Sequence, residues 1–307
     1  MRYLTLIGLF SFILVACDEN KDLPQHSLFL PGAKVQKVAE GFSYTEGPAV
    51  DLEGNIFFAD LGDNKIYKWA VLDNKISIFL ENSYGISGLF FDGDGNLYAC
   101  QRDKGRIISI APNGTQVVLA SEYHGKPFYK ANDVWVDPKG GVYFTHREDN
   151  PLPNEKYGGH IFYITPNKKN VIPVASDFKK PNGIIGTKDG KNLYVSDRKT
   201  QKTYRYKIDS NGNLTEKQLF ANVGSDGMTL DSKGNLYVTT DAVLVFNSDG
   251  KEINNIQIPE RPSNLSFGGK EGNKLFITAG TGLYVLEMAV AGMFGPKRSL
   301  IDDDLRH

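Results

Sequence analysis

A turn-and-strand unit recurs six times along this chain, and the repeat limits the possible folds more than any other feature. One copy reads DSKGNLYVTT around Gly234, where polar turn residues lead into an apolar strand. Each turn glycine is expected to adopt a positive φ in a tight hairpin, because a residue without a Cβ does so at little cost. The glycines, spaced 38 to 50 residues apart, are Gly54, Gly95, Gly140, Gly190, Gly234 and Gly272.

A second apolar segment follows each copy after a polar gap, as in KIYKWA, RIISIA and GLYVLE. A period of about 44 residues that contains several short strands is typical of propeller blades. The chain has 15 Tyr, 18 Phe and 32 Gly, a mixture that favours strands and turns. The sequence therefore predicts one all-β domain over residues 34–290, a six-bladed β-propeller around a central channel. Residues from about Val35 would begin the first blade or close the ring against the last.

The first seventeen residues have the pattern of an export signal. A short basic start precedes an apolar stretch, residues 4–15, that is shorter than a bilayer span. Small residues then lead to Cys17, and the polar run DENKD follows it. This arrangement resembles a bacterial lipoprotein signal, in which the cysteine is acylated and becomes the new N-terminus; an ordinary secretory signal is the alternative. We therefore expect lipid anchorage in the cell envelope, on its periplasmic or cell-surface face, with a tether over residues 18–33.

Charge and cysteine content exclude several other classes of protein. The net charge of −1 and the pI near 6.5 give no sign of the basic surface that nucleic-acid binding requires, so no nucleic-acid partner is expected. With Cys17 lipidated, only Cys100 remains, and it is expected to be a buried, inert thiol without a disulfide. The acidic run within residues 291–307 is most simply a solvated tail.

A polar residue stands eight positions before each turn glycine. Rotation about the channel axis relates equivalent positions of the blades, so these side chains are expected to converge at one end of the channel. Two carboxylates in a narrow pocket need a cation or a proton between them, and an all-oxygen set suits a hard divalent ion. Polar loops at strand ends are the simpler explanation. The six residues are Glu46, Ser87, Asn132, Asn182, Asp226 and Asn264.

Five segments of the chain resemble those of the SMP-30/gluconolactonase family, also called regucalcin-like lactonases. The resemblance runs from about Val38 to Met288. It implies a six-bladed propeller with one divalent metal ion in its channel, Ca²⁺ as the first choice and Mg²⁺ or Zn²⁺ as alternatives. The segments are SYTEGPAVDLEGNIFFAD, GKPFYKANDVWVDPKGGVYFT, FKKPNGIIGTKDGKNLYVSD, DGMTLDSKGNLYV and PSNLSFGGKEGNKLFITAG.

The resemblance also implies roles for individual residues. The glutamate of the family's EGP motif falls on Glu46, the asparagine of its NG motif on Asn182, and the aspartate of its DGM motif on Asp226. These three residues are the implied metal ligands, and Asp226 is also the implied catalytic acid–base. The family's ND asparagine falls on Asn132, which is expected to contact the substrate or a metal-bound water. Asn264 would complete the polar ring.

Three departures from the family pattern stand out, and the last two bear on the substrate. Ser87 replaces the asparagine of an NGL segment and removes one amide from the ring. Lys130 begins KAND where relatives often have SPND, and His146 ends YFTH where relatives often have YFTD. Both side chains are expected to contact the substrate and to influence its identity.

The function implied by the resemblance is metal-dependent hydrolysis of sugar lactones or related esters. The metal would polarise the carbonyl while Asp226 activates water. A phosphotriesterase-like hydrolase on the same fold is one alternative. A non-catalytic, lipid-anchored propeller that binds carbohydrate or protein is another, because propellers also serve as binding platforms.

Overall fold

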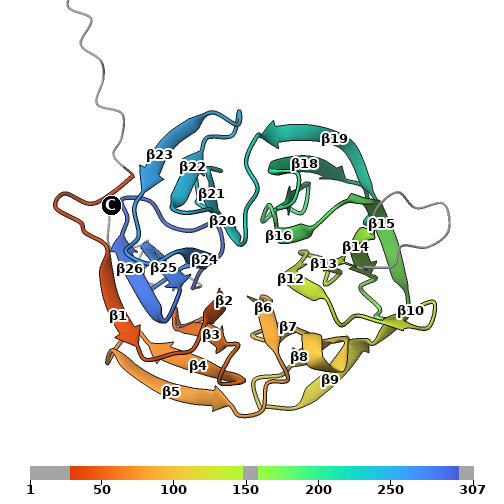
Figure 1. The fold of residues 1–307 in the computed structure, drawn as a ribbon, viewed down its shortest axis with the longest axis horizontal. Helices are drawn as coiled ribbons and strands as arrows, with labels where there is room; N and C mark the ends of the chain where they lie inside the picture. The colour runs from red at the N-terminus through yellow and green to blue at the C-terminus, as the bar shows by residue number, and fades with distance from the viewer. Residues whose placement is uncertain (1–27, 148–157, 297–307) are drawn as a thin grey trace, which may run out of the picture.

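The computed structural model describes residues 28–147 and 158–296, and this part of the chain forms six four-stranded antiparallel sheets. The sheets stand as blades around a central channel, as Figure 1 shows. The described residues contain one helix, the three-residue 3-10 helix η1 (Arg102–Lys104). None of this part of the chain forms a helix with the length and apolar character that crossing a bilayer would take. The predicted six-bladed all-β propeller is confirmed.

Each blade is a meander whose strands follow one another outward from the channel. Blade 1 consists of β2 (Thr45–Val50), β3 (Ile56–Asp60), β4 (Lys65–Ala70) and β5 (Lys75–Leu80). Blade 2 consists of β6 (Ile86–Phe91), β7 (Leu97–Gln101), β8 (Arg106–Ile110) and β9 (Gln116–Ala120). Blade 3 consists of β12 (Ala131–Val136), β13 (Val142–Arg147), β14 (Gly159–Ile164) and β15 (Val171–Phe178). A short hairpin of β10 (Glu122–Tyr123) and β11 (Lys126–Pro127) connects blades 2 and 3.

The remaining blades have the same four-stranded order, except that the outer strand of blade 6 comes from the start of the domain. Blade 4 consists of β16 (Pro181–Gly186), β17 (Asn192–Asp197), β18 (Lys202–Ile208) and β19 (Leu214–Ala221). Blade 5 consists of β20 (Met228–Leu230), β21 (Leu236–Thr239), β22 (Val243–Phe246) and β23 (Glu252–Ile256). Blade 6 combines both ends of the domain: β24 (Pro262–Gly268), β25 (Lys274–Ala279), β26 (Gly282–Glu287) and, on its outer edge, β1 (Gln36–Glu40).

The pairing of β1 with β26 closes the ring. The strands are antiparallel, with Gln36 opposite Val285 and Glu40 opposite Gly282. Of the two placements considered for the first residues of the domain, closure against the last blade is the one observed. The preceding residues also contact blade 6, since the amide of Ala289 donates a 2.8 Å hydrogen bond to the carbonyl of Leu28. The described end of the predicted tether therefore lies on the propeller.

Neighbouring blades pack face to face through apolar side chains. Trp135 of blade 3 belongs to the same buried cluster as Ile185 and Leu193 of blade 4. Strands that are covered on both faces lose strict apolar–polar alternation, as in β3, where all five residues of IFFAD are buried. Cys100 in β7 is a buried free thiol, as predicted, and burial raises its pKa.

The repeated turn is held by its own aspartate. In the copy at Gly234, which has a φ of +81°, the Asp231 carboxylate accepts hydrogen bonds from the backbone amides of Lys233 and Asn235, both at 2.9 Å. The Asn235 side chain adds a third bond to the same carboxylate at 2.7 Å. All six turn glycines have a positive φ, so this expectation from the sequence is confirmed.

Gly47, next to the ring residue Glu46, is expected to tolerate substitution far less well than the turn glycine Gly234. A Cβ on Gly47, which has a φ of +52°, would lie 1.9 Å from the carbonyl oxygen of Ser87 in the neighbouring blade, whereas a Cβ on Gly234 would meet no atom within 4 Å. Gly47→Ala should lower the free energy of unfolding by about 3 kcal/mol or more, because backbone must move. Gly234→Ala should cost only about 1 kcal/mol, for its positive φ.

Chemical denaturation of the two variants beside the unsubstituted protein measures this difference. Equal losses of stability would contradict close contact between blades 1 and 2 at this glycine.

Candidate functional site

The polar ring residues lie where the innermost strands begin, and the strands are irregular there. In blades 1 to 4 the register between the innermost strand and its neighbour shifts at this point. An irregularity of this kind takes residues out of the ladder and re-aims their side chains, which lets polar groups line the channel. The shifts fall between Glu46 and Ala49, Ile86 and Leu89, Ala131 and Val134, and Pro181 and Ile184.

Five of the six ring residues line one cavity of about 270 Å³ at this end of the channel. Lys130 lines the same cavity. Asn264 faces a second cavity further along the channel, but its Nδ2 is 3.5 Å from Glu46 Oε2. The structure thus brings acidic and amide groups of separate blades together. Figure 1 shows the innermost strands that carry or follow them, β2, β6, β12, β16, β20 and β24, around the channel. The five are Glu46, Ser87, Asn132, Asn182 and Asp226.

Asp226 is held by two different partners. Its Oδ1 accepts a 2.6 Å hydrogen bond from Asn182 Nδ2, and its Oδ2 forms a 2.7 Å ion pair with Arg198 Nη1. Because Asn182 donates through its nitrogen, its amide oxygen is the atom left to bind a cation. The Asp226 side chain is only 11% exposed, so these contacts form in a largely desolvated place.

Glu46 is more isolated from positive charge. It is buried, and its Oε2 accepts a 2.6 Å hydrogen bond from the amide of Gly47. No Lys or Arg of residues 28–147 or 158–296 forms an ion pair with it. Burial raises the pKa of Glu46 well above its usual value, and the negative charges of Asp226 and Asp133 add to this effect.

The pKa of Asp226 is raised as well. Burial is the main cause, and it outweighs the opposing effects of Arg198, the Asn182 hydrogen bond and Lys180. Two neighbouring carboxylates that both resist ionisation make a site where a divalent cation would relieve electrostatic repulsion.

The donor set fits a hard divalent ion. Glu46 and Asp226 offer carboxylate oxygens and Asn182 an amide oxygen, the ligand types that Ca²⁺ and Mg²⁺ prefer. Within the described residues no three side chains of the His, Cys, Asp and Glu types come close enough to hold a metal ion by themselves. The Asn182 amide is therefore needed to complete a three-ligand set.

Sequence reasoning missed most of the positive charge in this cavity. Only Lys130 was singled out, although four further cationic side chains line the same space. A signal was present, because an arginine follows the turn glycine by seven residues in blades 2 and 3 and by eight in blade 4. The four missed residues are Arg102, Arg147, Lys180 and Arg198.

His146 is placed differently from the other predicted substrate contacts. It is only 5% exposed, with its ring centroid 5.3 Å from that of Phe128 and 5.9 Å from that of Phe162. It is not among the residues that line the 270 Å³ cavity. A direct substrate contact by His146 stays a prediction that this arrangement does not support.

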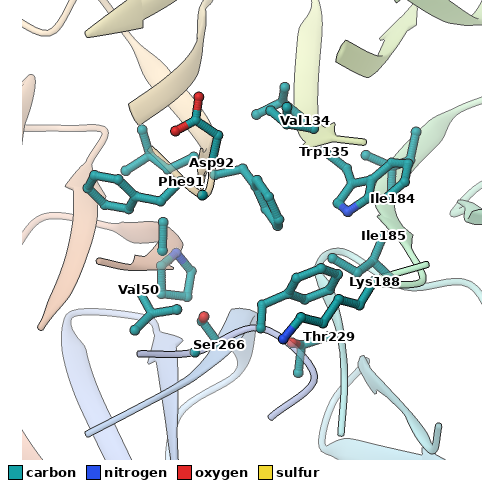
Figure 2. A pocket seen from close by; sticks show the side chains of 18 of the residues that line it. Val50, Phe91, Asp92, Val134, Trp135, Ile184, Ile185, Lys188, Thr229 and Ser266 are labelled. Carbon is teal, nitrogen blue, oxygen red and sulfur yellow. The ribbon is translucent and has the colours of Figure 1, made fainter. Parts of the chain in front are cut away.

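The channel widens into a larger cavity of about 520 Å³ at the other end, shown in Figure 2. Val134, Trp135, Ile184 and Ile185 give it an apolar wall. Three of its aspartates, Asp51, Asp92 and Asp137, hold hairpin turns: Asp92 accepts hydrogen bonds from the backbone and side chain of Asn96, both at 2.9 Å. A fourth, Asp133, accepts hydrogen bonds from the backbone amides of Val134 and Ile184 at 3.0 and 3.3 Å. These four carboxyl groups are therefore already engaged in bonds that hold the blades.

A segment that was assigned to the C-terminal tail borders the larger cavity. The amide of Met293 donates a 2.9 Å hydrogen bond to the carbonyl of Leu230 in β20. Phe294 packs edge-on against Phe90 of blade 2, with ring centroids 5.3 Å apart. The polar site consequently lies at the opposite end of the channel from this segment.

Comparison with known proteins agrees with the fold and the polar channel mouth. Residues 35–281 match the family described as the SMP-30/Gluconolactonase/LRE-like region. This chain belongs to that family. The resemblance predicted from the five sequence segments is thereby confirmed.

The curated relatives of this family member are lactonases over most of its length. The gluconolactonase of Zymomonas mobilis is 29% identical over 283 residues, which cover 80% of this chain and 78% of the relative. Lactonase drp35 of Staphylococcus haemolyticus is 28% identical over 242 residues, 73% of each chain. A solved gluconolactonase structure from Xanthomonas campestris shares the fold, with a TM-score of 0.76 and 24% identity over 85% of this chain and 91% of that one.

Asp133, beside the ring residue Asn132, is expected to make the stability of the metal-free protein depend on pH. Burial raises its pKa to about 7, well above the value of an unfolded chain. The folded state then binds more protons than the unfolded state between about pH 4 and pH 7, so stability falls as pH rises through this range. In chelator, Asp133→Asn should remove about 2 to 4 kcal/mol of the difference in unfolding free energy between pH 5 and pH 8.

The measurement is urea denaturation at both pH values, with Asp249→Asn at an exposed turn as the control. The asparagine variant also loses an acceptor for the backbone amide of Val134 or Ile184, so the comparison rests on the pH difference and not on absolute stability. An unchanged pH difference would show that Asp133 ionises normally.

Proposed function

We propose that this protein is a divalent-metal-dependent hydrolase of sugar lactones or related esters. The observation that carries the proposal is the meeting of two carboxylates, the buried Glu46 and the largely buried Asp226, with the Asn182 carboxamide at one mouth of the channel. Membership of a family with lactonase relatives over most of the chain supports the same reaction class.

When bound by Glu46, Asn182 and Asp226, a divalent ion such as Ca²⁺ would supply Lewis-acid polarisation of the lactone carbonyl. Asp226 would accept a proton from the water that attacks the carbonyl carbon, and its raised pKa makes it a stronger base than an exposed aspartate. The ring C–O bond then breaks, and the departing oxygen takes up the proton to give the open hydroxy acid. Asn132 and Lys130, which line the cavity, would orient substrate hydroxyls.

Hydrolysis should depend on both the metal and Asp226. With an aldonolactone panel in a pH-stat, chelator should abolish the rate and added Ca²⁺ should restore it. Asp226→Asn should lower kcat by about 10²-fold or more, because both a proton acceptor and a ligand charge are lost. Glu46→Gln should instead weaken Ca²⁺ binding, measured by calorimetry, and excess Ca²⁺ should partly restore its activity.

Rates that are insensitive to chelator would contradict the metal-dependent reading. Hydrolysis of phosphotriesters in place of lactones would favour the phosphotriesterase alternative. No hydrolysis of either class would favour a binding propeller.

We propose further that the enzyme is anchored to a bacterial envelope membrane through lipid on Cys17. Residues 1–27 lie outside the described residues, and the support is the small-residue, cysteine and polar-run pattern in the sequence. Expressed in a bacterium, the unsubstituted protein should enter the detergent phase of a Triton X-114 partition, whereas Cys17→Ala should stay in the aqueous phase. Equal partition of both proteins would remove the lipid anchor from the account.

A further inference from the structure

The candidate site carries more positive than negative charge. Among the described residues that line the 270 Å³ cavity, five side chains are cationic and two, Glu46 and Asp226, are anionic. If a divalent ion balances the two carboxylates, the described lining contains no further anionic side chain to match Arg102 and Lys180. The cationic residues are Arg102, Lys130, Arg147, Lys180 and Arg198.

These cations come from two positions that are joined by a backbone hydrogen bond in consecutive blades. The residue at or just after the end of the second strand donates its backbone N–H to the carbonyl of the residue just before the innermost strand: Arg147 to Lys130 at 3.4 Å in blade 3, and Arg198 to Lys180 at 3.0 Å in blade 4. Arg102 stands at the same position in blade 2, where its amide donates to Gly85 at 3.4 Å.

The other blades contribute no cation to the cavity. The equivalent pair in blade 1 is Tyr44 and Leu61, and blades 5 and 6 supply only Asp226 to the lining. Glu46 and Asp226 belong to blades 1 and 5, which flank blade 6, so the negative and positive sides of the mouth face each other. Figure 1 shows β6 and β12 across the channel from β20 and β24.

One cation is already committed to the catalytic carboxylate. Arg198 pairs with Asp226, whereas Arg102 and Lys180 form no ion pair within the described part of the chain. Partly buried cations such as Arg102 and Lys180, with no ion pair in the described part of the chain, favour a bound anion.

We propose that the preferred substrate carries an oxyanion group, a carboxylate or a phosphate, in addition to the lactone or ester carbonyl. This inference rests on the proposed function and narrows its substrate class. With the carbonyl near Glu46 and Asp226, the oxyanion would face Arg102 and Lys180, which line the same cavity. Guanidinium groups suit this role because they bind carboxylate and phosphate oxygens through two parallel hydrogen bonds.

The test compares kcat/KM for three lactones in the metal-loaded enzyme: neutral gluconolactone, glucarolactone with a free carboxylate, and 6-phosphogluconolactone. At least one anionic lactone should be preferred about tenfold or more over the neutral one, the gain expected from one charge-assisted contact. The better of the two anionic lactones identifies the oxyanion. Arg102→Gln and Lys180→Gln should each lower the anionic-to-neutral ratio, and the exposed Lys207→Gln should leave it unchanged.

A binding measurement separates failure of this inference from failure of the proposed function. By calorimetry in chelator, glucarate or 6-phosphogluconate should bind more tightly than the uncharged polyol glucitol, and Arg102→Gln should remove most of the difference. Chelator-sensitive hydrolysis without any preference for an anionic lactone would overturn the substrate inference and leave the lactonase intact. Oxyanion binding that depends on Arg102, without hydrolysis of any lactone, would overturn the lactonase and support the oxyanion site.

Discussion

Closure of the ring by β1 against β26 is the constraint on which the geometry of the channel depends. No described blade contributes more than three polar side chains to the cavity at the mouth, and none of the blades forms a site alone. Pairing between Gln36 and Val285 joins the first strand of the domain to its last blade, so the six inner strands are held around one axis. Side chains that are separated by up to 180 residues, such as Glu46 and Asp226, can then act on the same space.

The electrostatics of the mouth follow from this enforced proximity. The propeller places Glu46 and Asp226 in one cavity, where burial makes ionisation of both carboxyl groups unfavourable. Arg198 and Asn182 stabilise the charged form of Asp226 but do not contact Glu46. Glu46, which has no ion-pair partner in the described part of the chain, favours a bound cation, while Arg102 and Lys180 favour a bound anion. A metal ion and an anionic substrate would therefore complement the two sides of the cavity.

Sequence reasoning predicted the architecture and the ring because both follow from a repeated spacing. The offset of eight residues from each turn glycine finds Glu46 and Asp226 without knowledge of the strand register. The same offset could not distinguish Asn264, which lines the other cavity further along the channel, from the five residues at the mouth. The direction of its side chain depends on a local strand irregularity between Pro262 and Asn264. The burial of His146 depends on Phe128 and Phe162, which come from separate segments, and no local pattern reveals such packing.

The arginines could have been found from the sequence, since Arg102 and Arg147 share one offset from their turn glycines. Whether these arginines line the cavity depends on the strand register, which places the end of the second strand beside the start of the innermost strand. This register is a property of the folded sheet. The central claim, that Glu46, Asn182 and Asp226 together hold one metal ion, is tested most directly by anomalous diffraction from crystals grown with Mn²⁺. The account predicts a single strong peak within coordination distance of all three side chains. A peak elsewhere, or none at saturating metal, would contradict it.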